Sequence, residues 1–111
     1  MEERKPNNPE PQRRPDDERI PEALFELGQL VVTPGAVEAL KQDKRHPVQL
    51  ISSHVLGDWG TLPEEDVAEN EFSLKNGYRL FSSYEFESGN KYYVITEWDR
   101  SVTTVLLPSE Y

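Results

Sequence analysis

The sequence predicts an α+β domain: one N-terminal strand, three short helices, and then a three-stranded antiparallel meander. Three observations predict it. Prolines and glycines divide residues 34–77 into segments in which apolar residues recur with a helical period. Residues 78–108 instead form β-branched and aromatic segments joined by short turns. Nearly all Leu, Val, Phe, Tyr and Trp follow residue 21, which leaves enough chain for one domain and too little for two.

Residues 1–21 are expected to form a disordered, charged tail, and residues 22–111 a single small α+β domain. The tail holds five of the nine prolines, six acidic and five basic residues, and only two clearly apolar ones, Met1 and Ile20. A segment of this composition cannot bury enough apolar surface to offset the entropy lost on ordering. The rest of the chain is long enough to fold alone with modest stability.

The first strand is predicted over 24–33, where Leu, Val and Phe are frequent and Gly28 indicates a bulge. We expect it to join the sheet at an edge or beside the last strand. Thr33 and Pro34 form a helix start, with a hydroxyl as N-cap and proline at the first helical position. This helix is predicted over 34–43 and ends at the "KRHP" segment, because the residue before a proline is disfavoured in a helix.

The second helix is predicted over 47–56, where apolar residues repeat with a helical period. Gly57 is expected to end it in a left-handed conformation. The spacing of Thr61 and Glu64 predicts a capping box at the start of a third helix, which runs to about Asn76 and stops at Gly77.

The three strands of the meander are predicted over 78–86, 91–98 and 101–108, with "ESGN" and "DR" as hairpin turns. Side chains alternate along a strand, so Tyr92 and Tyr93 point to opposite faces of the sheet. One face must cover the helices, and the sequence leaves open which one. The other face would display aromatic and hydroxyl groups.

Such a display is a candidate binding surface, with Tyr84 and Tyr92 as its named aromatic residues. The alternative is that tyrosine is simply frequent in strands.

The predicted domain is strongly acidic. It carries fifteen Asp and Glu against seven Lys and Arg, a net charge of −8. This charge opposes direct binding to nucleic acid or to an anionic membrane and favours a basic protein as partner, for example one that normally holds nucleic acid. The alternative is that the charge serves solubility alone.

Several chemistries find no support in the sequence. Without cysteine there is no thiolate nucleophile and no zinc site of the Cys type. Phosphate-binding loops, HExxH and GxSxG are absent, and we expect no metal and no cofactor. No signal-peptide core or membrane-length apolar run is found, so we expect a cytoplasmic protein.

The segment "HVLGDWG" is the first candidate site. His54 lies near a helix C-terminus, which favours a charged imidazole, and Asp58 could orient it as a general base. The structural alternative is a tight connection in which Trp59 fills the core between the second and third helices. Asp58 and Trp59 are also candidate binding residues.

The final hairpin, "TEWDRS", is the second candidate site. Glu97 could act as a base and Arg100 as an oxyanion clamp. Asp99 and Arg100 are further candidate binding residues. More often such an Asp-Arg pair is a solvated turn.

Four segments carry a resemblance to a known family: "LGQLVVTPGAVEAL", "HVLGDWG", "NGYRLFSSY" and "YYVITEWDRSVTTVLLPSEY". Over about residues 25–111 the chain resembles small proteins of bacterial plasmids, integrated elements and phages. These are loosely labelled "plasmid-related protein" or "type I restriction endonuclease subunit M". The resemblance implies a bacterial mobile-element origin and no activity. A methyltransferase role finds no support, because the chain is short and lacks a nucleotide-binding loop.

Two functions follow as hypotheses. The first is an accessory binding module of a mobile element that engages a basic protein, as an anti-defence protein or nucleic-acid mimic would. The second is a small ribonuclease, because the order of helices and strands distantly resembles RNA-cleaving toxins of the barnase and RelE kind. In that case His54 and Glu97 would be the acid/base pair and Arg100 would stabilise the transition state.

Overall fold

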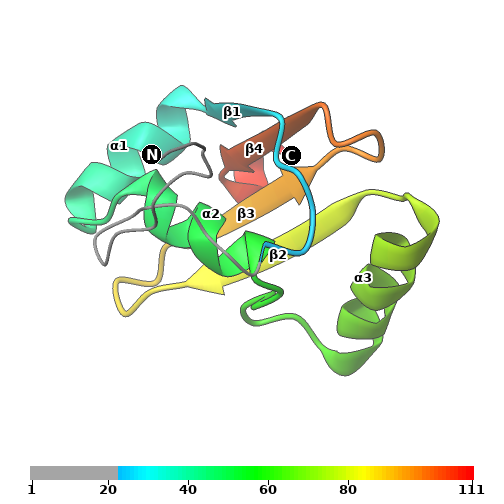
Figure 1. Cartoon of the computed structure of the whole chain (residues 1–111). Helices are drawn as coiled ribbons and strands as arrows, with labels where there is room; N and C mark the ends of the chain where they lie inside the picture. The colour runs from blue at the N-terminus through cyan, green and yellow to red at the C-terminus, as the bar shows by residue number, and fades with distance from the viewer. Residues whose placement is uncertain (1–22) are drawn as a thin grey trace, which may run out of the picture.

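The computed structural model describes residues 23–111, so the tail predicted over 1–21 lies outside the described residues. The described chain has an α+β fold with three helices and a four-stranded mixed sheet (Figure 1). The elements are β1 (Gln29–Val32), α1 (Pro34–Gln42), α2 (Pro47–Val55), α3 (Glu64–Asn76), β2 (Leu80–Glu85), β3 (Lys91–Thr96), β4 (Val102–Leu106) and the short 3-10 helix η1 (Pro108–Glu110).

The strand order in the sheet is β1-β4-β3-β2. Strands β2, β3 and β4 pair antiparallel in sequence order, as predicted. The first strand lies beside the last one, also as predicted, but the pairing is parallel, from Gln29 opposite Val102 to Val32 opposite Val105. The sheet is therefore mixed rather than a simple meander. The outer edge of β4 offers unpaired backbone groups, and β1 satisfies them.

The first strand is shorter than predicted, and Gly28 precedes it instead of forming a bulge within it. Gly28 has a φ of +66°, and a Cβ atom there would collide with the main-chain oxygen of Ser101. The amide of Gln29 then donates to that same oxygen at 2.9 Å. Gly28 thus lets two backbones approach closely where β1 begins to pair.

The starts of the first two helices are fixed by local side chains. Thr33 accepts a hydrogen bond from the amide of Ala36 at 3.2 Å, which confirms its predicted N-cap role. At α2 the N-cap is His46, whose Nδ1 accepts from the amide of Val48 at 3.1 Å. The side-chain oxygen of Gln49 in turn accepts a hydrogen bond from the His46 amide at 2.9 Å. This histidine capping box was not predicted from the sequence.

The third helix ends as predicted, at Gly77 with a φ of +75°, but its predicted start is wrong. The capping box of Thr61 and Glu64 does not form. The hydroxyl of Thr61 instead donates to the main-chain oxygen of Ser83 at 3.1 Å. Pro63 occupies the N-cap position without a side-chain hydrogen bond. Thr61 thus ties the loop before α3 to β2, and its hydroxyl is no longer available as a cap.

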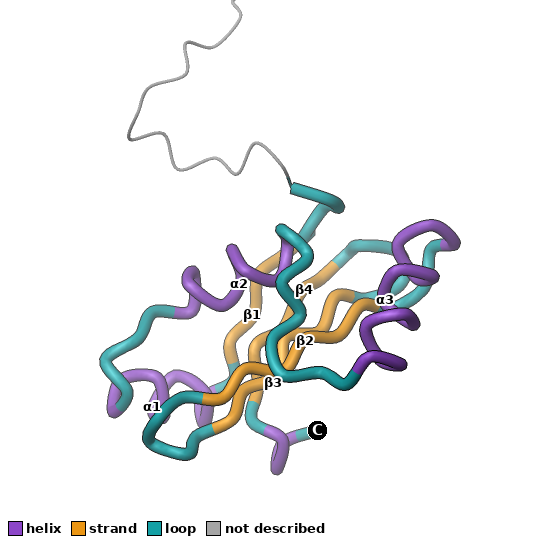
Figure 2. Tube along the Cα trace, turned by 90° about the horizontal axis from the view of Figure 1, so that it is seen from below, coloured by secondary structure: helices purple, strands orange, loops and turns teal. Residues whose placement is uncertain are grey.

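The core lies between α1, α2 and the face of the sheet that carries Tyr92. Its buried residues are Ala36, Leu40, Leu50, Ile51, Tyr92, Val94 and Val105. Helix α1 packs against β4 and α2 against β3, whereas α3 lies against β2 (Figures 1 and 2). The opposite face, which carries Tyr93, is therefore the one that these two helices leave uncovered. Within residues 23–111, no helix combines the length and apolarity needed to cross a membrane.

Candidate functional site

The first candidate, His54, is completely buried on α2. Its Nδ1 lies 2.6 Å from the hydroxyl oxygen of Ser82, and its Nε2 lies 2.9 Å from that of Thr96. Burial, followed by the positive charge of Arg100, lowers the pKa of His54 to about 3. The imidazole is therefore neutral at physiological pH, and both of its nitrogens are engaged inside the protein.

The hydrogen bonds continue from this imidazole across the sheet and define its tautomer. The hydroxyl of Thr103 donates to the main-chain oxygen of Leu27 at 2.8 Å. It must therefore accept from the hydroxyl of Thr96, 2.7 Å away, because each hydroxyl has one proton. Thr96 has then used its proton and accepts from His54, so that Nε2 of His54 carries the hydrogen. Nδ1 accepts from Ser82.

Arg100, at the turn between β3 and β4, is likewise engaged within the fold. Its guanidinium donates to the main-chain oxygens of Tyr78 at 2.7 Å and of Glu97 and Trp98 at 3.1 Å. A fourth hydrogen bond reaches the main-chain oxygen of Ser73 in α3 at 3.3 Å. Arg100 therefore joins the final hairpin to the C-terminal end of α3. It is not free to clamp an oxyanion while these bonds are made.

The two carboxylates of the hairpin make no hydrogen bond to His54. Both ring nitrogens of His54 are already bonded to the hydroxyls of Ser82 and Thr96, so neither Glu97 nor Asp99 is a hydrogen-bond partner of the imidazole. Asp99 is exposed, and its Oδ1 accepts from the amide of Ser101 at 3.1 Å. Hydrogen bonds from Ser101 lower the pKa of Asp99. The described geometry thus leaves the His54–Glu97 acid/base pair without support.

Trp59 occupies the core position that was the structural alternative for the segment "HVLGDWG". It is 4% exposed and stacks with Phe25 at a centroid distance of 6.3 Å. It also meets the His54 ring edge-on at 5.7 Å, and its Nε1 donates to Glu71 of α3 at 3.4 Å. Trp59 therefore fills the space between α2 and α3, as predicted.

Asp58, by contrast, is exposed and organises the turn that follows α2. Its carboxylate accepts from the amide of Gly60 at 3.2 Å. Its main-chain oxygen accepts from the hydroxyl of Tyr84 at 2.6 Å. Tyr84 is half-buried, and burial raises the pKa of its hydroxyl. Asp58 and Tyr84 therefore both stabilise the turn that follows α2.

Tyr92, the other aromatic residue of the predicted display, is buried in the core. Its hydroxyl donates to the carboxylate of Asp43 at 2.6 Å. Burial and this bond raise the pKa of Tyr92. The prediction that Tyr92 belongs to an exposed binding surface is therefore wrong: the face that carries Tyr92 is the covered one.

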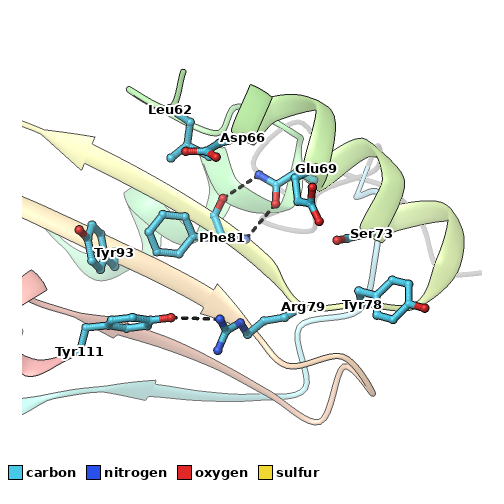
Figure 3. A pocket seen from close by; sticks show the side chains of 10 residues that line it. Leu62, Asp66, Glu69, Ser73, Tyr78, Arg79, Phe81, Tyr93 and Tyr111 are labelled. Carbon is cyan, nitrogen blue, oxygen red and sulfur yellow. Dashed lines mark hydrogen bonds between the residues drawn. The ribbon is translucent and has the colours of Figure 1, made fainter. Parts of the chain in front are cut away.

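The uncovered face contains a pocket of about 560 Å³ beside α3 (Figure 3). Four aromatic residues are among the described residues that line it. Three of them have their rings in contact: Phe81 of β2, Tyr93 of β3 and Tyr111, just after η1. The fourth, Tyr78, stacks on Phe72 instead. The rings of Phe81 and Tyr93 meet edge-on at a centroid distance of 4.7 Å, and those of Tyr93 and Tyr111 at 5.9 Å. We refer to these three rings as the aromatic floor. It forms because alternation puts Phe81 and Tyr93 on the face to which η1 returns.

One side chain of α3, Asn70, positions the helix beside this floor. It is 3% exposed, its amide nitrogen donates to the main-chain oxygen of Phe81 at 2.7 Å, and its Oδ1 accepts from the Phe81 amide at 3.1 Å. This reciprocal pair joins α3 to the edge of β2. Asp66 and Glu69 lie four and one positions earlier on the helix, so both exposed carboxylates stand at the pocket rim (Figure 3).

A single cationic side chain, Arg79, lines the pocket on the side of Tyr111. Its Nη2 donates to the hydroxyl of Tyr111 at 3.0 Å (Figure 3). Its guanidinium carbon also lies 5.9 Å from the centroid of that ring, within cation–π distance. The pocket therefore combines an aromatic floor with carboxylates on one side and a guanidinium on another.

This pocket was not predicted from the sequence. Two sequence features pointed towards it. Strand alternation places Tyr93 on the face opposite Tyr92, and Asp66 and Glu69 are three positions apart on a helix. Neither indicates that Tyr111 returns to the sheet or that Asn70 docks α3 against β2. Among residues 23–111, no group of three His, Cys, Asp or Glu side chains is placed to hold a metal ion.

Comparison of the chain with protein-family models, curated proteins and solved structures finds no match. The resemblance to mobile-element proteins stays a prediction.

Proposed function

We propose that the protein is a binding module that engages a basic protein segment through the pocket between α3 and the aromatic floor. The observation that carries the proposal is that the three rings of the aromatic floor and the carboxylates of Asp66 and Glu69 line the same pocket. Cationic side chains are attracted to aromatic faces and to carboxylates, and a pocket that offers both suits a Lys or Arg side chain.

The charge around the pocket supports the same partner. Helix α3 carries five acidic residues against one lysine, and three of the acids lie in its first turn. Together with the net charge of −8 over residues 22–111, this field attracts basic segments and repels phosphate. A basic bacterial protein that normally holds nucleic acid fits this description. Within a mobile element, the module would then act in the cytoplasm as a nucleic-acid mimic or anti-defence protein.

The ribonuclease alternative has no comparable support. The imidazole of His54 is buried, and the guanidinium of Arg100 is bound to four main-chain oxygens. A general acid/base must reach the substrate atom with which it exchanges a proton.

Titration calorimetry with short lysine- or arginine-rich peptides in a glycine and serine background tests the proposal. The critical variant neutralises both rim carboxylates, Asp66→Asn with Glu69→Gln. Its matched control neutralises two exposed acids at the far end of β2, Glu85→Gln with Glu87→Gln, and so changes net charge equally.

We expect binding that weakens steeply with salt and weakens several-fold in the rim variant. The estimate follows from about 0.2–1 kcal/mol for each exposed charge pair. The control should lose much less. Equal losses in both variants would reduce the binding to a general effect of net charge. Absence of binding to every basic peptide would reject the proposal.

A further inference from the structure

The side chain of Arg79 already makes, within the molecule, the contact that a basic ligand would need. Its Nη2 donates to the hydroxyl of Tyr111, and its guanidinium lies within cation–π distance of the same ring. The aromatic floor therefore accepts a guanidinium in this protein, supplied by its own chain.

The ring of Tyr111 is nonetheless within reach of a ligand. Tyr111 is 65% exposed, and Arg79 is exposed as well. The arginine side chain is flexible, and its contact with Tyr111 is exposed. A ligand can therefore displace it from the ring at a modest cost in free energy. Entry of a second cation would meet the positive charge of Arg79 unless that side chain moved away.

We infer that the pocket selects the arginine side chains of a basic partner and that Arg79 is a tethered competitor for the Tyr111 ring. The inference rests on the proposed function and names the chemical group that the pocket takes. A planar guanidinium can lie over an aromatic face while donating to a carboxylate such as Asp66 or Glu69. The compact ammonium of lysine, a strongly hydrated point charge, does this less well.

The test compares peptides that differ only in carrying arginine or lysine, using the full chain and two variants. Arg79→Ala removes the competitor. Arg45→Ala is the matched control, because it removes the same charge and also a cation–π contact, with Phe86 at 4.6 Å. Phe86 lies just beyond β2, at the end of the strand far from Phe81 and the pocket. Both arginines are exposed, so both variants should fold.

We expect the arginine peptide to bind the unaltered chain more tightly than the lysine peptide does. Arg79→Ala should strengthen binding of the arginine peptide by about two- to fivefold, the range of an exposed cation–π contact. Arg45→Ala should change the affinity for the arginine peptide less than twofold, because a single exposed charge far from the pocket is screened by salt.

Three results would overturn the inference. Arg79→Ala could leave the affinity unchanged or weaken it, which would make Arg79 a bystander or a ligand contact. Arg79→Ala and Arg45→Ala could strengthen binding equally, which would reduce the effect to net charge. The lysine peptide could bind as well as the arginine peptide, which would leave a basic-segment module without arginine selection. If neither peptide binds any of the three proteins, the proposed function fails together with the inference.

Discussion

The substitution Thr96→Val tests the buried hydrogen-bond network around His54. In the native protein the hydroxyl of Thr96 accepts from Nε2 of His54 and donates to Thr103. Valine keeps the shape of threonine but can make neither bond. The imidazole then holds a donor or an acceptor without a partner in a fully buried position. Leaving such a group unsatisfied costs about 1–3 kcal/mol.

Urea denaturation measures this loss in the free energy of unfolding. The control is Thr96→Ser, which keeps the hydroxyl and removes one methyl group, at about 0.8 kcal/mol. Nitrogen NMR of the His54 ring adds a second readout. We expect hydrogen on Nε2 in the native protein. In Thr96→Val we expect it to shift to Nδ1, which can donate to Ser82.

A Thr96→Val variant that is as stable as the native protein would show that the hydrogen bonds of Thr96 do not stabilise the fold. A native His54 with hydrogen on Nδ1 would contradict the assigned tautomer, because the order of donors from His54 to the main-chain oxygen of Leu27 would then be different.

Three further predictions concern stability. Because the pKa of His54 is about 3 when folded and near 6.5 when unfolded, the unfolded chain binds the extra proton, and stability falls as pH drops from about 6.5 towards 3. This slope, at most about 1.4 kcal/mol per pH unit, should flatten in His54→Gln, as pH-dependent denaturation would show. Trp59→Ala should cost about 3–5 kcal/mol because the indole is buried, and an unchanged melting temperature would contradict that. Gly28→Ala should destabilise the fold more than Gly77→Ala. Both glycines have a positive φ, but only at Gly28 would the new methyl group collide with main-chain atoms. Equal melting temperatures of the two variants would argue against the close approach of Gly28 to Ser101.

The sequence correctly predicted the helix ends that depend on neighbouring residues. The start of α1 at Thr33 and the end of α3 at Gly77 depend on residues within one turn, and both are as predicted. The capping box of Thr61 failed because its hydroxyl bonds to Ser83, 22 positions along the chain. A local pattern carries no information about such a competing partner.

The candidate site was missed for the same physical reason. Two of the features that build the pocket, the docking of α3 by Asn70 on Phe81 and the return of Tyr111 to the sheet, join distant positions. The sequence marked His54 and Arg100 as chemically notable, and both are indeed in polar networks. Whether such a residue faces solvent or the interior is decided by the packing of α2 and the final hairpin.

NMR mapping of the basic peptide on the full chain would locate the binding site residue by residue. We predict that the largest shift changes fall on the rings of Phe81, Tyr93 and Tyr111 and on the Asp66–Glu69 turn of α3. Shift changes spread over the acidic surface would show that the pocket is not the binding site, as would changes centred on the β2–β3 turn around Glu87.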